Sequence, residues 1–68
     1  MNDTNNLSIE LNSNFPRRRE QLLNILHYIQ DEYGYISKVS MQAIGNHIKM
    51  PVSEIYGTVT SYSEFKIK

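Results

Sequence analysis

The side chains best suited to metal chemistry in this 68-residue sequence are two histidines, His27 and His47, because the chain contains no cysteine. A zinc site requires a third protein ligand with suitable geometry. Asp31 follows His27 by one helical turn, but no further ligand converges on this pair. The absence of cysteine excludes disulfides, cysteine-ligated zinc and iron–sulfur ligation by this chain. We therefore expect no catalytic, cofactor-binding or metal-binding residue, and no enzyme activity of the chain by itself.

Three consecutive arginines, Arg17, Arg18 and Arg19, are the densest run of charge. They open an expected helix, where positive charge opposes the helix dipole at a cost of roughly a few tenths of a kcal/mol each. Two interpretations stay open: a solvated helix start that Glu20 partly offsets, or a contact with an acidic partner surface. The formal net charge of zero argues against broad electrostatic binding of nucleic acid, which needs several phosphate-neutralising cations.

The N-terminal segment is polar and rich in asparagine, and such a composition buries too little apolar surface to offset chain entropy. Residues 1–14 are therefore expected to be a flexible, disordered polar tail. Leu7, Ile9 and Leu11 alternate at strand period, so an extended segment that docks on a partner is the alternative. The segment lacks the features of a signal peptide, and no apolar run reaches membrane-spanning length. We expect a cytoplasmic protein without membrane insertion.

Residues 15–65 are expected to form one helical domain, with residues 66–68 as the C-terminal end. A first main helix is predicted over 16–33, because Pro16 suits a first helical turn and apolar residues then recur at helical spacing. Gly34 is expected to end this helix in the left-handed conformation.

Ser37 is the expected N-cap of a second helix over 38–47, and Pro51 separates it from a third helix over 51–62. The sequence thus predicts an all-α fold, a small bundle of three main helices with a disordered polar N-terminal tail. Gly57 lies inside the third helix, where glycine costs about 1 kcal/mol relative to alanine. We expect it to mark the close approach of another backbone.

Residues 41–59 also resemble a DNA-binding helix-turn-helix, with the small residue Gly45 in the first of its two helices. Major-groove readout relies on arginine, lysine, asparagine and glutamine. The recognition helix of such a motif would contain no arginine or lysine before Lys66. DNA binding is kept as an alternative function, beside a standalone regulatory or assembly role.

Two stretches, residues 22–36 and 50–65, together resemble the N-terminal helical part of a known family. This is the family of the thioredoxin-like [2Fe-2S] ferredoxin component of NADH dehydrogenase (complex I), with relatives in NAD-linked formate dehydrogenases and hydrogenases. In that family the cluster ligands belong to a following domain, so cluster binding does not carry over to this cysteine-free chain. The residues that carry the resemblance are Leu23, Leu26, His27, Gln30, Gly34, Tyr35, Ile36, Pro51, Ile55, Tyr56, Gly57, Thr60, Tyr62 and Phe65.

The sequence departs from the family at Ser61 and Glu64, where the family usually has apolar residues. These positions are neighbours on one helix face, and burying an unpaired carboxylate is costly. We expect this face to be exposed to solvent because the chain lacks a second domain. A chain trimmed from a longer protein is the alternative.

The resemblance implies a non-catalytic helical interaction module of an electron-transport oxidoreductase complex, docked on its flavin- and NADH-binding subunit. The cofactors FMN, NAD and iron–sulfur clusters would then belong to the partner complex and not to this chain. For Tyr33, Tyr56 and Tyr62 a place in the core is the preferred interpretation, although tyrosine and arginine are enriched in interface hot spots. The predicted partner-binding residues are Arg17, Arg18, Arg19, Tyr35, Ile36, Tyr56, Tyr62 and Phe65.

Overall fold

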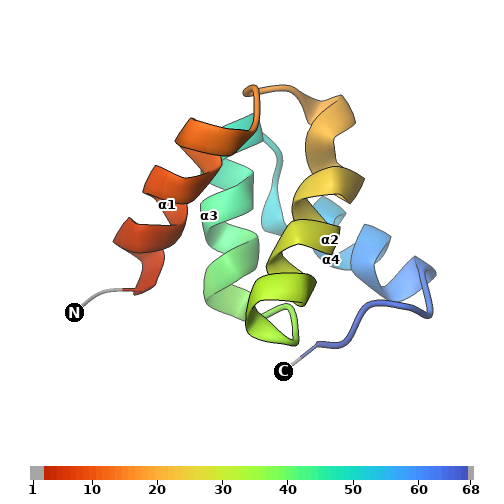
Figure 1. Cartoon of the computed structure of the whole chain (residues 1–68). Coiled ribbons are helices and arrows are strands. Elements are labelled where there is room, and N and C mark those ends of the chain that lie inside the picture. The colour runs from red at the N-terminus through yellow and green to blue at the C-terminus, as the bar shows by residue number, and fades with distance from the viewer. Residues whose placement is uncertain (1–2, 68) are drawn as a thin grey trace.

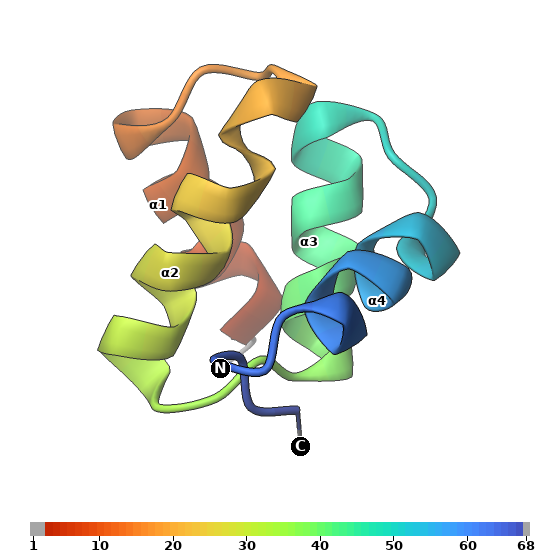
Figure 2. The same ribbon diagram turned by 90° about the vertical axis from the view of Figure 1, so that its right-hand side faces the viewer.

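The computed structural model describes residues 3–67 of the chain, and the side chains from residue 7 onward. The elements are α1 (Asp3–Asn14), the short 3-10 helix η1 (Arg19–Gln21), α2 (Leu22–Tyr33), α3 (Lys38–Ile48) and α4 (Val52–Ser61). Figures 1 and 2 show α1, α2 and α3 packed alongside one another, with α4 lying across them. Within the described residues no helix is long and apolar enough to cross a membrane.

The all-α prediction is confirmed, and the three predicted main helices correspond to α2, α3 and α4. Two of the predicted helix boundaries are confirmed in detail. Gly34 follows α2 with a φ of 85°, the left-handed conformation that glycine adopts without a Cβ clash. The Ser37 hydroxyl oxygen accepts a hydrogen bond from the Ser40 backbone N–H at 3.0 Å, which satisfies an otherwise unpaired donor in the first turn of α3.

The start of α2 differs from the prediction, because Pro16 does not begin a helix. Arg18 is extended, with φ −133° and ψ 143°, and α2 begins only at Leu22 after the turn of η1. Residues 15–18 are needed to reverse the chain between α1 and α2 (Figure 1). His47 anchors this connection, since its Nε2 donates to the carbonyl oxygen of Phe15 at 3.0 Å.

The N-terminal segment also differs from the expected disordered tail, because residues 3–14 form α1. Leu7 and Leu11 are buried, with exposed fractions of 4% and 0%, whereas Ile9 is 63% exposed. Two leucines four residues apart share one helix face, and α1 places this face against α3. The alternation of Leu7, Ile9 and Leu11 by itself suggests an extended strand. The structure shows a helix instead, in which Leu7 and Leu11 are buried and Ile9 is exposed.

A single hydrophobic core is shared by the four α-helices and the C-terminal segment. Among its fully buried side chains are Leu11 of α1, Ile25 of α2, Ile44 of α3 and Ile55 of α4. Every one of these helices therefore contributes at least one large apolar side chain that is removed from water, which is the dominant favourable term in folding.

The close backbone approach predicted at Gly57 is found instead at Gly45. A Cβ on Gly45 would lie 2.6 Å from the carbonyl oxygen of Met50 and 3.5 Å from Cδ1 of Ile55, whereas a Cβ on Gly57 would meet nothing within 4 Å. The turn from α3 to α4 folds back over Gly45, whose carbonyl oxygen accepts from the Met50 N–H at 3.0 Å. Gly45 is therefore required sterically, and Gly57 is an exposed helical glycine.

Candidate protein-interaction surface

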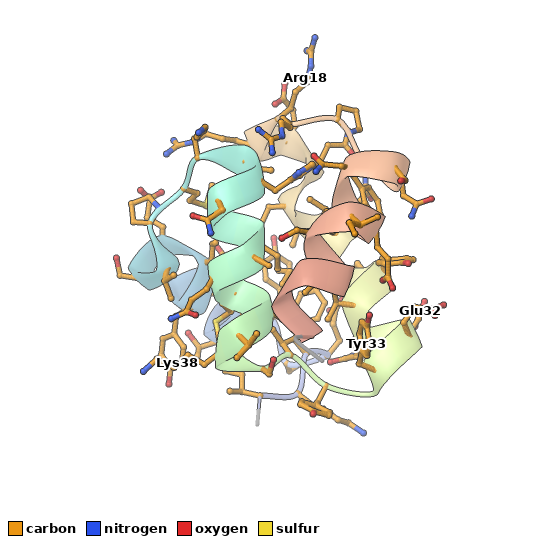
Figure 3. The ribbon with its side chains drawn as sticks, turned by 90° about the vertical axis from the view of Figure 1, so that its left-hand side faces the viewer. Arg18, Glu32, Tyr33 and Lys38 are labelled. Atoms are coloured by element: carbon orange, nitrogen blue, oxygen red, sulfur yellow. The ribbon has the colours of Figure 1, made fainter. Side chains whose placement is uncertain are left out.

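The three predicted arginines lie at one end of the bundle, where the α1–α2 connection meets the α3–α4 turn. Arg17 Nε donates to Asn12 Oδ1 at 3.2 Å, and Arg19 Nη2 lies 3.5 Å from the carbonyl oxygen of Lys49. Arg18 projects from this end of the molecule in Figure 3. We call Arg17, Arg18, Arg19 and Lys49 the cationic end.

The structure changes the electrostatic interpretation of these arginines. The sequence places them at the start of a helix, where the dipole opposes positive charge, but tertiary packing brings two helix C-termini to the same end. Arg17 contacts the last turn of α1 through Asn12, and Arg19 contacts the residue that caps the C-terminus of α3. Cations are favourable at helix C-termini, so the helix dipoles at this end of the bundle favour Arg17 and Arg19 instead of opposing them.

The predicted turn residues Tyr35 and Ile36 differ in exposure. Ile36 is fully buried, and its N–H donates to the carbonyl oxygen of Lys66 at 2.6 Å, beside an isolated parallel bridge between Ile36 and Ile67. The Tyr35 side chain is 38% exposed. Of these two residues, Tyr35 alone offers surface to a partner, and the backbone of Ile36 pairs with the C-terminal segment.

The preferred core interpretation of three tyrosines is wrong. Tyr33, Tyr56 and Tyr62 have exposed fractions of 44%, 51% and 40%. Helical spacing suggested burial, but each ring lies at the edge of the bundle instead of inside it. The predicted contact residue Phe65 is 7% exposed, and its ring packs 4.9 Å from the ring of His27.

The two positions at which the sequence departs from its family pattern are both exposed, as expected. The Ser61 hydroxyl donates to the carbonyl oxygen of Gly57 at 2.8 Å. Glu64 contacts His27, with Oε2 and Nε2 3.1 Å apart and both side chains 52% exposed. The polar side chains at these positions are thus accommodated by contacts within the helix and with α2.

Both histidines are engaged in contacts other than metal ligation. His27 contacts Glu64, and His47 is 3% exposed with its Nε2 bonded to Phe15. Since a carbonyl oxygen can only accept, His47 carries its proton on Nε2 when neutral. The described part of the chain contains no group of three or more histidine, cysteine, aspartate or glutamate side chains that could hold a metal ion.

A carboxylate shared by two tyrosines joins α1 to α2, and sequence reasoning missed it. Glu10 Oε1 accepts from the hydroxyl of Tyr28 at 3.1 Å and from the hydroxyl of Tyr33 at 3.0 Å. Desolvation, followed by the hydrogen bond and the negative charge of Glu10, raises the pKa of Tyr33 to about 12. Tyr33 is 44% exposed, so water still reaches part of the residue beside the Glu10 carboxylate. The pKa of Tyr28 is raised by the same causes.

The amide side chain of Gln30 makes two hydrogen bonds from α2 to the C-terminal segment, a role that sequence reasoning did not predict. Gln30 Nε2 donates to the carbonyl oxygen of Glu64, and Gln30 Oε1 accepts from the Lys66 N–H, both at 2.6 Å. An amide that donates and accepts in this way satisfies two backbone groups that lie outside the helices. Gln30 therefore fixes the path of residues 64–66 along α2.

An open pocket of about 430 Å³ lies beside the α3–α4 turn. One side is formed by the exposed amides Gln42 and Asn46 of α3, with Gly45 between them, and the other by the turn and the first residue of α4. The α3–α4 turn and the two helices that it joins are seen in Figure 2. The lining residues are Gln42, Gly45, Asn46, Met50, Pro51 and Val52.

Most of this chain is similar in sequence to a known protein family and to two of its relatives. The family model described as thioredoxin-like [2Fe-2S] ferredoxin matches residues 9–68. An NADH-quinone oxidoreductase subunit of Aquifex aeolicus (strain VF5) is 35% identical over 51 residues, which cover 75% of this chain and 32% of that protein. The HndA subunit of an NADP-reducing hydrogenase of Solidesulfovibrio fructosivorans is 26% identical over 57 residues, which cover 84% of this chain and 33% of that protein. The chain spans about a third of the length of these curated relatives.

Proposed function

This chain belongs to the thioredoxin-like [2Fe-2S] ferredoxin family, and on that premise we propose that it is a non-catalytic helical interaction module of an oxidoreductase complex. The family resemblance of residues 22–36 and 50–65 is confirmed by the match. The observation that carries the proposal is that both relatives are named as subunits, one of an NADH-quinone oxidoreductase and one of an NADP-reducing hydrogenase. We propose docking on the flavin- and NADH-binding subunit of such a complex in the cytoplasm.

The residues of this chain do not fit the iron–sulfur cluster that the family description names. Iron–sulfur clusters are held by cysteine thiolates, with histidine replacing some of them in one class. This sequence has no cysteine, and its two histidines are engaged by Glu64 and by the backbone of Phe15. We propose that FMN, NAD and iron–sulfur clusters are cofactors of the partner complex.

We propose that the predicted contact residues that are accessible touch the partner, although they are spread over different ends of the bundle. Tyr56 and Tyr62 expose rings at α4 and just beyond its end, Tyr35 exposes its ring in the α2–α3 turn, and Arg18 projects from the cationic end. Large amphipathic side chains of these types supply much of the binding energy in protein interfaces. Ile36 and Phe65 are buried, so we propose that they act on docking only through the packing of the C-terminal segment.

Co-purification from the source organism tests the proposal. The tagged chain is expected to recover a flavin- or NAD-binding oxidoreductase subunit, identified by mass spectrometry. Tyr56→Ala is expected to reduce recovery, while Val39→Ala, which also shortens an exposed apolar helix side chain (42% exposed), serves as the matched control. Recovery of no redox subunit by the unaltered chain would remove the proposal.

DNA binding stays as the second candidate, because α3, its turn and α4 have the order of a helix-turn-helix and approach closely at Gly45. The ten residues of α4 contain no arginine or lysine, which leaves the position of a recognition helix without the side chains that usually read guanine. A salt-dependent shift of duplex DNA by the purified chain would favour this function. A standalone regulator would instead compete with a full-length family member for the complex.

A further inference from the structure

The pocket beside the α3–α4 turn lies next to the cationic end of the molecule. Lys49 directly precedes the lining residue Met50 in the chain, and Arg19 reaches across the turn. Arg19 Nη2 lies 3.5 Å from the carbonyl oxygen of Lys49 and 3.9 Å from Oε1 of Glu54. The pocket is thus flanked by two exposed cations from different elements.

The charge of the chain is segregated, although it sums to zero. Of the six cations in the described residues, four form the cationic end. The other two, Lys38 and Lys66, lie toward the opposite end: Lys38 begins α3, and the backbone carbonyl oxygen of Lys66 accepts from the Ile36 N–H. Figure 3 shows Arg18 and Lys38 at opposite ends of the molecule. Two carboxylates, Glu20 next to Arg19 in η1 and Glu54 in contact with Arg19, lie at the same end, so the four cations exceed these anions by two. The pocket therefore lies beside a local excess of positive charge that the net charge conceals.

The contacts that hold Arg19 are too weak to compete with a well-placed carboxylate from a partner. A donor–acceptor distance of 3.5 Å is at the limit of hydrogen bonding. The pair with Glu54 is longer still, and its side chains are 57% and 55% exposed, so solvent screens it. Arginine binds carboxylates with two parallel hydrogen bonds, a geometry that neither present partner supplies.

We propose that this pocket binds an acidic segment of the partner protein, and that an apolar side chain of that segment enters between α3 and α4. The apolar lining of Met50, Pro51 and Val52 would receive this side chain, and the amides of Gln42 and Asn46 would bond its backbone. Arg19 and Lys49 would meet the flanking carboxylates. The inference rests on the proposed docking function and names the chemistry of the segment that docks.

The test is an NMR titration of the isotopically labelled full chain with a synthetic peptide, in which one leucine is flanked by aspartates and glutamates. The side-chain NH₂ groups of Gln42 and Asn46 give signals of their own and report on the pocket directly. We expect saturable shifts at these two amides and at the Gly45 N–H, and weaker binding at higher salt. No shift, or shifts scattered over the surface, would overturn the inference.

Two double variants of equal charge separate a local site from general attraction. Arg19→Gln with Lys49→Gln is expected to weaken binding about fivefold to tenfold, as the loss of two exposed charge contacts implies. Lys38→Gln with Lys66→Gln lowers the net charge equally at the opposite end, and is expected to change affinity by less than about twofold. Equal weakening by both pairs would refute a built site. Tighter saturation of the same amides by duplex DNA would also refute it, since the occupant would then be nucleic acid.

Recovery of the oxidoreductase partner by the double variant and by the unaltered chain separates the pocket from the docking function. If Arg19→Gln with Lys49→Gln still recovers the oxidoreductase partner in full, the pocket is not the docking site and the proposed function stands. If the unaltered chain recovers no such partner, the proposed function fails whatever the peptide does. Circular dichroism and the melting temperature of each variant establish that it is folded.

Discussion

Two glycines in neighbouring helices should respond in opposite directions to the same substitution. Gly45 and Gly57 both lie within α-helices, so replacing either by alanine gains helix propensity of up to about 1 kcal/mol. Their surroundings differ, because a Cβ on Gly45 would lie 2.6 Å from the Met50 carbonyl oxygen, while a Cβ on Gly57 would meet nothing within 4 Å.

The magnitude follows from these distances. A backbone oxygen cannot rotate away as a side chain can, so Gly45→Ala must displace the α3–α4 turn, and overpacking of this kind costs about 1–3 kcal/mol. After the full gain in propensity of about 1 kcal/mol, we expect a net loss of up to about 2 kcal/mol in the free energy of unfolding for Gly45→Ala. For Gly57→Ala we expect a net gain of about 0.5–1 kcal/mol.

Thermal unfolding followed by circular dichroism measures both effects. For a domain of this size a change of about 1 kcal/mol shifts the melting temperature by about 4–8 °C. Gly45→Ala should therefore melt several degrees lower than the parent chain, and Gly57→Ala several degrees higher. Urea unfolding of the same variants gives the free energies independently of the thermal midpoints. If both variants move in the same direction, the steric account of Gly45 is refuted.

Three further perturbations test contacts that hold the bundle together. Leu11→Ala should lower the free energy of unfolding by about 2–4 kcal/mol, whereas Ile9→Ala on the exposed face of α1 should change it by less than about 0.5 kcal/mol; equal urea midpoints would mean that α1 is not packed. Gln30→Ala should speed hydrogen exchange of the Lys66 N–H, which loses its acceptor, and unchanged protection would contradict the fastening role of this amide. The pKa of Tyr33 is raised to about 12 in the folded chain, from about 10 in the unfolded chain. The hydrogen bonding of the neutral hydroxyl therefore stabilises the fold fully below a pH of about 10. This stabilisation is lost as the pH rises through about 12. Urea unfolding at stepped pH should show this decline, and Tyr33→Phe should make it shallower, so a decline of unchanged steepness would contradict the assignment.

The candidate surface was only partly readable from the sequence. Residue types identified arginines and tyrosines as candidates, but exposure depends on which faces the helices present to one another. No local pattern separates Tyr35, which is exposed, from Ile36, which is fully buried. The pocket lined by Gln42 and Met50 likewise combines residues whose proximity depends on the path of the turn between α3 and α4.

Local sequence was sufficient to predict the three main helices, two of their boundaries and the family. Amphipathic spacing, the Ser37 cap and the left-handed Gly34 act over about four residues or fewer, so neighbouring side chains and backbone groups set them. The fourth helix, α1, which buries Leu7 and Leu11, could be found only from the tertiary structure. A helix this short is marginally stable in isolation, so it depends on packing against α3. The same contacts make Gly45 the sterically required glycine and place the arginines beside two helix C-termini, since both outcomes depend on elements far apart in the chain.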